Sequence, residues 1–214
     1  DSTALLALAG VTGHKGLRAF SISVDDSATD ESPIARRTAQ HFGADYHEKR
    51  LDAAEAQRLF GSFLEHLDQP SIDGLNTFTV SALAREQGMK VVLSGLGGDE
   101  VFGGYSSFRQ IPTMTRLHRW MNQLPLGARV AAAALRRSGE PSHRRMAAYL
   151  QTDGSIAHAY RSLRGIFTRS EAASMTSWIT GLASWTPPAD TDTPPVSESV
   201  ANQISELELS LYMR

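Results

Sequence analysis

Residues 89–105, MKVVLSGLGGDEVFGGY, limit the possible folds of this chain more than any other stretch. The run Val91-Val92-Leu93 predicts a strand covered on both faces, because it is apolar and rich in β-branched residues. The glycines that follow leave backbone N–H groups open to an anion, but Asp99 and Glu100 would repel a phosphate unless a metal ion lay between them. The stretch therefore predicts either a site for a metal-bound phosphate or a strand-to-helix turn that the glycines only shape.

Strands alternate with helices in the first half of the chain. Further strands are expected at 17–24 and 45–51, and helices at 1–10, 31–42, 53–67 and up to residue 87. This alternation predicts an α/β fold, in which a parallel sheet has flanking helices and right-handed crossovers. Ligands of such sheets bind beyond the carboxyl ends of the strands, so residues 1–2, 24–26 and 94–99 are expected at one edge.

From Phe108 onward the periodicity indicates helices only, which makes the second part of the chain all-helical. The expected helices are 111–123, 126–137, 143–151, 155–163, 169–175 and 200–214, with Pro112, Pro125 and Pro141 at helix starts. A proline-rich segment near 185–199 is expected to be a linker or exposed loop. The predicted domains are therefore 1–108, an α/β core, and 109–214, a helical part.

Composition excludes several classes of site. The chain has no cysteine, so it has neither disulfides nor thiolate zinc sites, and no apolar run is long enough to span a bilayer. These features lead us to expect a cytoplasmic protein without a membrane partner. Residues 109–145 carry eight arginines against Glu140 alone, which we interpret as a solvated helical face rather than a nucleic-acid surface.

Common catalytic motifs are absent or incomplete. No Walker-type P-loop occurs, and the dinucleotide fingerprint that starts at Gly95 and Gly97 would place its third glycine at Glu100. The histidines are scattered without metal-ligand spacing, and Ser94 lacks the Gly-x-Ser-x-Gly context of a hydrolase nucleophile. A dehydrogenase, a zinc enzyme and a serine hydrolase are all disfavoured.

Residues 94–105, SGLGGDEVFGGY, closely resemble the pyrophosphate-loop motif in the synthetase domain of the glutamine-dependent asparagine synthetase family. The opening Asp1-Ser2 resembles the last two residues of that family's Ser-Gly-Gly-x-Asp-Ser ATP loop. Weaker similarities lie at 30–31, 69–70, 73–77 and 204–208, so the resemblance extends over nearly the whole chain. Compared with the family, the chain is expected to be truncated at both ends.

The resemblance implies an ATP pyrophosphatase domain of the PP-loop type, with an adenine nucleotide α-hydrolase-like fold. Such domains adenylate a carboxylate with ATP, release magnesium pyrophosphate and let ammonia displace AMP to form an amide. The implied ligands are ATP, Mg²⁺, ammonia and a small carboxylic acid acceptor, either aspartate or a related acid.

The family's functional residues carry over to matching positions of this sequence. The implied pyrophosphate contacts are Ser2, Ser94, Gly95, Leu96, Gly97 and Gly98. Asp1 and Asp99 correspond to the metal-binding carboxylates, and Asp99 is also the implied catalytic residue. The adenine side is expected at Ser23, Val24 and Asp25, and the acceptor is expected at Asp73, Asn76 and Thr77.

Two departures from the family bear on substrate and activity. Leu96 stands where asparagine synthetases commonly have glutamate, and the 71–77 loop offers Asp73 and Asn76 where they offer arginine to the aspartate carboxylate. The alternatives are a β-lactam synthetase-like amide former and a non-catalytic nucleotide-binding module.

The family's N-terminal glutaminase domain and the strand before Asp1 have no counterpart in this sequence. The sequence as it stands is therefore expected to be inactive alone. Its sheet must leave a gap, rearrange, or borrow a strand edge from a second copy in a homodimer.

Overall fold

The computed structural model describes residues 1–24, 30–68, 71, 74–124, 126–181 and 197–212. The chain divides into two compact units, Asp1–Leu96 and Gly97–Arg214, and each is described by itself. The expected functional division after residue 108 stays a prediction.

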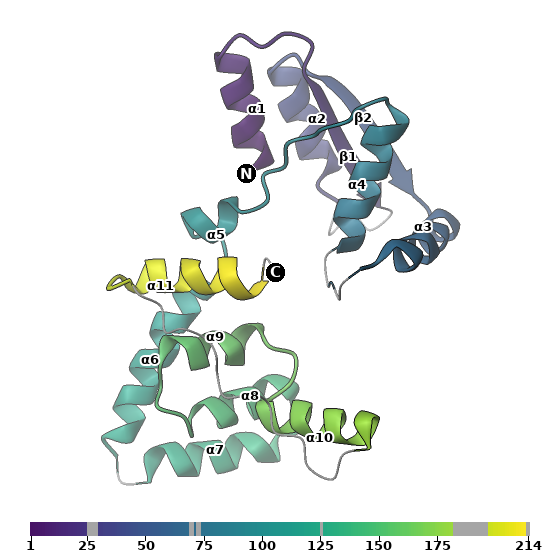
Figure 1. The fold of residues 1–214 in the computed structure, drawn as a ribbon. Coiled ribbons are helices and arrows are strands. Elements are labelled where there is room, and N and C mark those ends of the chain that lie inside the picture. The colour runs from purple at the N-terminus through teal and green to yellow at the C-terminus, as the bar shows by residue number, and fades with distance from the viewer. Residues whose placement is uncertain (25–29, 69–70, 72–73, 125, 182–196, 213–214) are drawn as a thin grey trace. The chain divides into compact units, whose positions relative to one another are not determined.

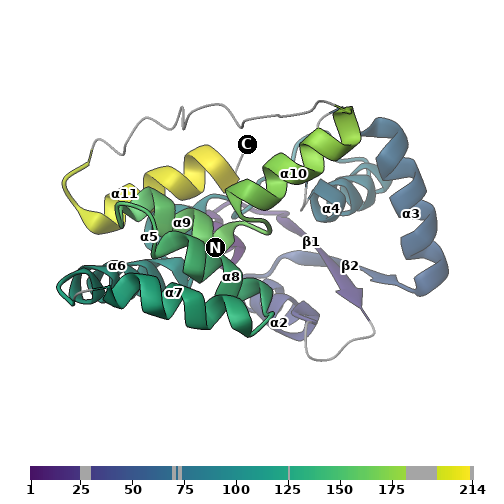
Figure 2. The ribbon, with the colours of Figure 1, turned by 90° about the horizontal axis from the view of Figure 1, so that it is seen from below.

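In the first unit, α1 (Ser2–Val11) precedes β1 (Arg18–Val24), and α2 (Ser32–His41) leads to β2 (Asp45–Leu51). The strands pair in parallel, from Arg18 opposite Asp45 to Val24 opposite Leu51. The unit continues with α3 (Ala53–His66) and α4 (Gly74–Glu86). Both α2 and α4 contact β1, and they lie on opposite sides of the strands (Figures 1 and 2). The expected α/β part with a parallel pair and flanking helices is thereby confirmed.

The predicted strand at Val91–Leu93 is wrong. These residues form no strand, and Val91 and Leu93 are 76% and 85% exposed. A strand needs a neighbour for its N–H and C=O groups, and among the described residues the sheet consists of β1 and β2 only. The β-branched run is therefore exposed chain without regular secondary structure rather than a buried strand.

The second unit is helical, as expected. It contains α5 (Gly98–Phe102), α6 (Ser107–Asn122), α7 (Gly127–Arg137), α8 (Pro141–Tyr149), α9 (Ile156–Arg164), α10 (Arg169–Thr180), α11 (Val200–Leu207) and the π-helical turn η1 (Glu208–Tyr212). One apolar cluster joins α6, α8, α9 and α11 through Ile111, Tyr149, Tyr160 and Ile204. A smaller cluster joins α7 to α8. Within the described ranges, no helix combines the length and hydrophobicity that a bilayer crossing requires.

Of the prolines predicted to lie at helix starts, one does and one does not. Pro141 begins α8 as predicted, because its missing N–H and preset φ suit the first helical turn. The prediction for Pro112 is wrong, since α6 begins at Ser107 and holds Pro112 inside it. Ser107 and Ile111, which precede the proline, are buried, and their packing favours a helix that begins before Pro112. Pro125, Gln69-Pro70 and most of the proline-rich segment lie outside the described residues.

Candidate functional site

In the first unit, the glycine-rich loop meets the beginning of the chain. The backbone N–H of Gly95 donates to Ser2 Oγ at 3.1 Å, and the N–H of Leu96 donates to Ser94 Oγ at 3.2 Å. A Cβ atom added to Gly95 would lie only 2.7 Å from the Cβ of Asp1. The structure thus brings Asp1, Ser2 and Gly95 together across 93 positions, and only glycine fits at 95.

The second unit begins with the rest of the loop. Gly97 caps α5 with φ +96°, in the left-handed region that favours glycine. At the other end of α5, the N–H groups of Gly103 and Gly104 both donate to the carbonyl oxygen of Asp99, at 3.1 and 3.0 Å. The side chain of Asp99 lies against Gly104, where an added Cβ would be 2.7 Å from the carboxyl carbon. These turns fix the backbone of Asp99, and the missing side chain at Gly104 leaves room for its carboxylate.

The other predicted site residues that the structure describes in the first unit are Ser23, Val24, Asn76 and Thr77. Ser23, in β1, is buried, whereas Val24 is 39% exposed. Asn76 and Thr77 lie exposed in the first turn of α4. Within the described part of this unit, the hydrogen bonds that join Ser2 to Gly95 do not extend to Ser23. Asp25 and Asp73 lie outside the described residues.

A buried ionic network in the second unit was missed by sequence reasoning. Glu208 has no exposed surface and accepts hydrogen bonds from Ser107, Tyr160 and Arg164. Arg164 also lies over the ring of Tyr105. Burial is the main cause that raises the pKa of Tyr105 to about 12, and the hydrogen bond that Tyr105 donates to Glu100 is the second. The sequence contains one sign of this network, which is the position of Glu208 on an apolar helix face, four residues after Ile204 and three before Leu211. A charge on such a face must be buried and paired.

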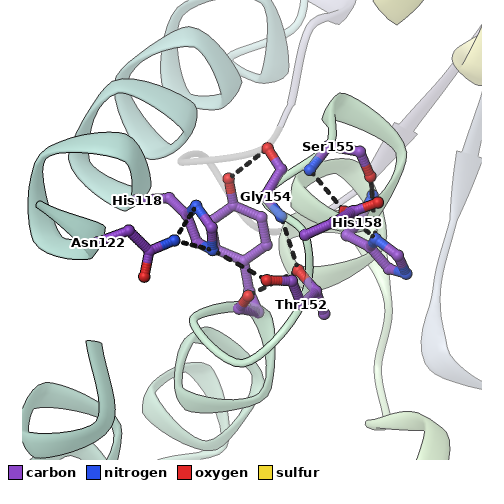
Figure 3. Close-up of polar contacts among 8 residues, drawn as sticks. His118, Asn122, Thr152, Gly154, Ser155 and His158 are labelled. Carbon is purple, nitrogen blue, oxygen red and sulfur yellow. Dashed lines mark hydrogen bonds and ion pairs between the residues drawn. The ribbon is translucent and has the colours of Figure 1, made fainter. Parts of the chain in front are cut away.

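A second polar cluster in this unit has histidines but lacks the geometry of a catalytic site. In Figure 3, His158 lies beside Ser155 at the start of α9, while His118 and Asn122 of α6 face the 152–154 turn. His158 Nδ1 is 2.9 Å from both Ser155 Oγ and Asp153 Oδ1. A nucleophile relay needs the two ring nitrogens to serve different partners, so this is a helix cap rather than a catalytic triad. In the described part of the chain, no group of three or more His, Asp or Glu side chains could hold a metal.

Known proteins similar to the chain point to one family. The family model described as asparagine synthase matches residues 1–214. Amidase chyE of Penicillium rubens is 35% identical over 123 residues, which are 56% of this chain and 18% of that protein. Glutamine-hydrolysing asparagine synthetase 1 of Saccharomyces cerevisiae is 30% identical over 110 residues, 50% of this chain and 19% of that protein.

Asparagine synthetase B of Escherichia coli is 29% identical over 106 residues, 48% of this chain and 19% of that protein. In each of these three relatives the matched segment spans less than a fifth of the protein's length. No solved structure is significantly similar to the chain.

Proposed function

Because the chain belongs to the asparagine synthase family, we propose that it is the ATP-dependent carbon–nitrogen ligase part of a glutamine-dependent amidotransferase. One observation carries the proposal. Ser2 and Gly95 come from two motif segments far apart in sequence, and they are joined by a hydrogen bond where no side chain fits at 95. A glycine-lined turn beside serine hydroxyls is suited to a phosphate group. The PP-loop type of fold and the domains 1–108 and 109–214 are part of this proposal.

The pyrophosphate of ATP is held by a loop that Ser2, Ser94, Gly95, Leu96, Gly97 and Gly98 line. The Ser2 and Ser94 hydroxyls donate to it, together with the N–H groups of residues 97 and 98. The N–H groups of Gly95 and Leu96 donate to Ser2 Oγ and Ser94 Oγ, and thereby hold the two hydroxyls in place before the nucleotide binds. Ser23, Val24 and Asp25 form the adenine side, and the position of Ser23 and Val24 at the carboxyl end of β1 supports this assignment.

Asp1 and Asp99 are the residues that would hold the metal ion. Mg²⁺ in nucleotide sites takes one or two carboxylates together with phosphate oxygens, so two carboxylates fit this ion. Gly104 supports the assignment of Asp99, because its missing side chain leaves room for that carboxylate. A magnesium ion held by Asp1 and Asp99 would neutralise charge on the pyrophosphate.

The reaction consists of two displacements. An oxygen of the acceptor carboxylate attacks the α-phosphorus of ATP, the bond from that phosphorus to the bridging oxygen breaks, and pyrophosphate leaves. Ammonia then attacks the acyl carbon, the bond to AMP breaks, and a proton is lost as the amide forms. The loop residues orient the triphosphate and hold the departing group in place.

The acceptor is aspartate or a related carboxylic acid. Residues Asp73, Asn76 and Thr77 form its side of the site, and the exposure of Asn76 and Thr77 supports a contact with a ligand. The absence of arginine from this loop favours an acceptor other than aspartate. Leu96, apolar and 60% exposed, favours one second candidate, a nucleotide-binding module without ligase turnover.

Calorimetry on the full-length protein tests the proposal. ATP with Mg²⁺ should bind, and Asp99→Asn should weaken that binding by about tenfold or more, because a charged ligand to the ion is lost. Asp45→Asn, the same change at a carboxylate that is 67% exposed in β2, should bind like the parent. Absence of binding by the parent protein would contradict both candidates. Binding without pyrophosphate release for any of a panel of carboxylic acids would favour the non-catalytic module.

A further inference from the structure

Within the second unit, a series of contacts runs from Glu208 through Arg164 and Tyr105 to Glu100. The Glu208 carboxylate is fully buried and accepts from Ser107 Oγ at 2.6 Å and from Tyr160 OH at 2.9 Å. Arg164 adds two donors to the same carboxylate, Nε at 3.1 Å and Nη2 at 2.8 Å. A buried charge persists only where its oxygens are satisfied, and these four donors therefore hold both the carboxylate and the guanidinium in one orientation.

The guanidinium of Arg164 lies between two aromatic rings. Its Cζ atom is 4.3 Å from the ring centroid of Tyr105 and 4.3 Å from that of Tyr212. The two rings meet edge to face, with centroids 5.9 Å apart. A planar cation stacks well on aromatic faces, whereas a lysine ammonium lacks the plane. The ion pair with Glu208 thus fixes the position of the Tyr105 ring.

Tyr105 in turn contacts α5 through Glu100. Its hydroxyl donates to Glu100 Oε1 at 2.9 Å, and Glu100 is only 1% exposed. Ser205 Oγ also donates to the carbonyl oxygen of Glu100, which ties the same residue to α11. Glu100 directly follows Asp99, so the last link of the series of contacts is the backbone of the proposed metal ligand.

A purely stabilising role explains this arrangement poorly. Buried ion pairs add little stability compared with apolar side chains of the same volume, and their best-attested role is to specify one arrangement. We propose that Arg164 is a positioning residue for Asp99, acting through Tyr105 and Glu100. The role in magnesium binding rests on the proposed function, whereas the positioning of α5 does not.

Two phenylalanine substitutions in the full chain separate positioning from packing. Tyr105→Phe keeps the ring on Arg164 and removes the bond to Glu100. Tyr212→Phe removes a hydroxyl from the other stacked ring and leaves that bond in place. Hydrogen exchange of residues 98–104 should speed up by about tenfold in Tyr105→Phe, as expected for one lost hydrogen bond to a charged group, and should not change in Tyr212→Phe. Exchange in α7 should be the same in all three proteins.

Arg164→Lys tests the origin of the effect. It should speed exchange in residues 98–104 as Tyr105→Phe does, and the double variant should be no worse than either single one, since both break the same series of contacts. Additive effects, or equal effects of the two tyrosine variants, would overturn the proposal. So would unchanged exchange in α5.

The magnesium readout keeps the two proposals distinguishable. In the full-length protein, Tyr105→Phe should raise the magnesium concentration needed for half-maximal ATP binding severalfold, and Tyr212→Phe should not. If the parent protein binds no ATP, the proposed function fails, while exchange in residues 98–104 still decides whether Arg164 positions α5. If ATP binds and the magnesium dependence is identical in all variants, the link from Arg164 to the metal ligand is refuted.

Discussion

At Gly104, one missing side chain makes room for the Asp99 carboxylate. The backbone at Gly104 needs no left-handed conformation, in contrast to Gly103, whose φ is +75°. The requirement for glycine at 104 is therefore one of space alone, and it can be tested with the smallest possible side chain.

Gly104→Ala should displace the Asp99 side chain, because the new Cβ would lie 2.7 Å from the carboxyl carbon. We expect the affinity of the full-length protein for magnesium ATP to fall about tenfold, with a loss of about 1–3 kcal/mol in stability from overpacking. Calorimetry and urea unfolding measure the two effects. Gly61→Ala is the matched control, since nothing lies within 4 Å of its new Cβ in α3 and it should stabilise by ~0.5–1 kcal/mol. Parent-like ATP affinity in Gly104→Ala would argue against Asp99 as a ligand.

At the scale of elements, the start of α9 shows how a cap shifts a titration. The carboxylate of Asp153 accepts from the backbone N–H of Ser155 at 2.9 Å, and His158 Nδ1 lies 2.9 Å from the same carboxylate oxygen. The hydrogen bond from the Ser155 N–H is the larger cause that lowers the pKa of Asp153 to about 2, and the contact with His158 is the smaller. The folded pKa is thus below the ordinary value, so the stabilising contribution is complete above about pH 4 and is lost as the pH falls towards 2.

A carboxyl titration by NMR should give a midpoint for Asp153 of about 2. Its contribution to stability should stay below ~1 kcal/mol, because the side chain is 68% exposed and the interaction is screened. His158→Phe should raise the midpoint only in part, since the larger contribution, the N–H of Ser155, remains. A midpoint at the ordinary value in the parent protein would show that this cap does not persist in solution.

At the scale of the whole molecule, the two units differ in how much apolar surface they bury. Both described clusters of buried apolar side chains lie in residues 97–214. In the first unit, the described part of the sheet has two strands, and Val24, Val91 and Leu93 are exposed. Stability is therefore expected to be uneven along the chain.

Native-state hydrogen exchange should find the slowest amides in α6, α9 and α11 and faster exchange in β1. Ile111→Ala removes a fully buried side chain from the larger cluster and should cost about 2–5 kcal/mol there. Protection in α6 and α9 should fall, while protection in β1 should not change. A parallel loss in both units would show that the chain unfolds as a single cooperative unit.

Features that depend on local spacing could be predicted from the sequence. Period-two and period-3.6 patterns located β1, β2 and most helices, and Pro141 marked the start of α8. The residues of the 94–105 motif were sufficient to identify the asparagine synthase family. These inferences succeed because hydrophobic period, turn chemistry and motif identity are properties of neighbouring residues.

Which distant segments meet became clear from the folded chain alone. It left Val91–Leu93 unpaired, kept Pro112 inside α6, and set Gly95 against Ser2. It also buried Glu208 against Arg164, a pair 44 positions apart. The physical reason is the same in each case. Whether a backbone edge finds a partner, whether a Cβ has room and whether a charge is satisfied all depend on groups that are remote in sequence.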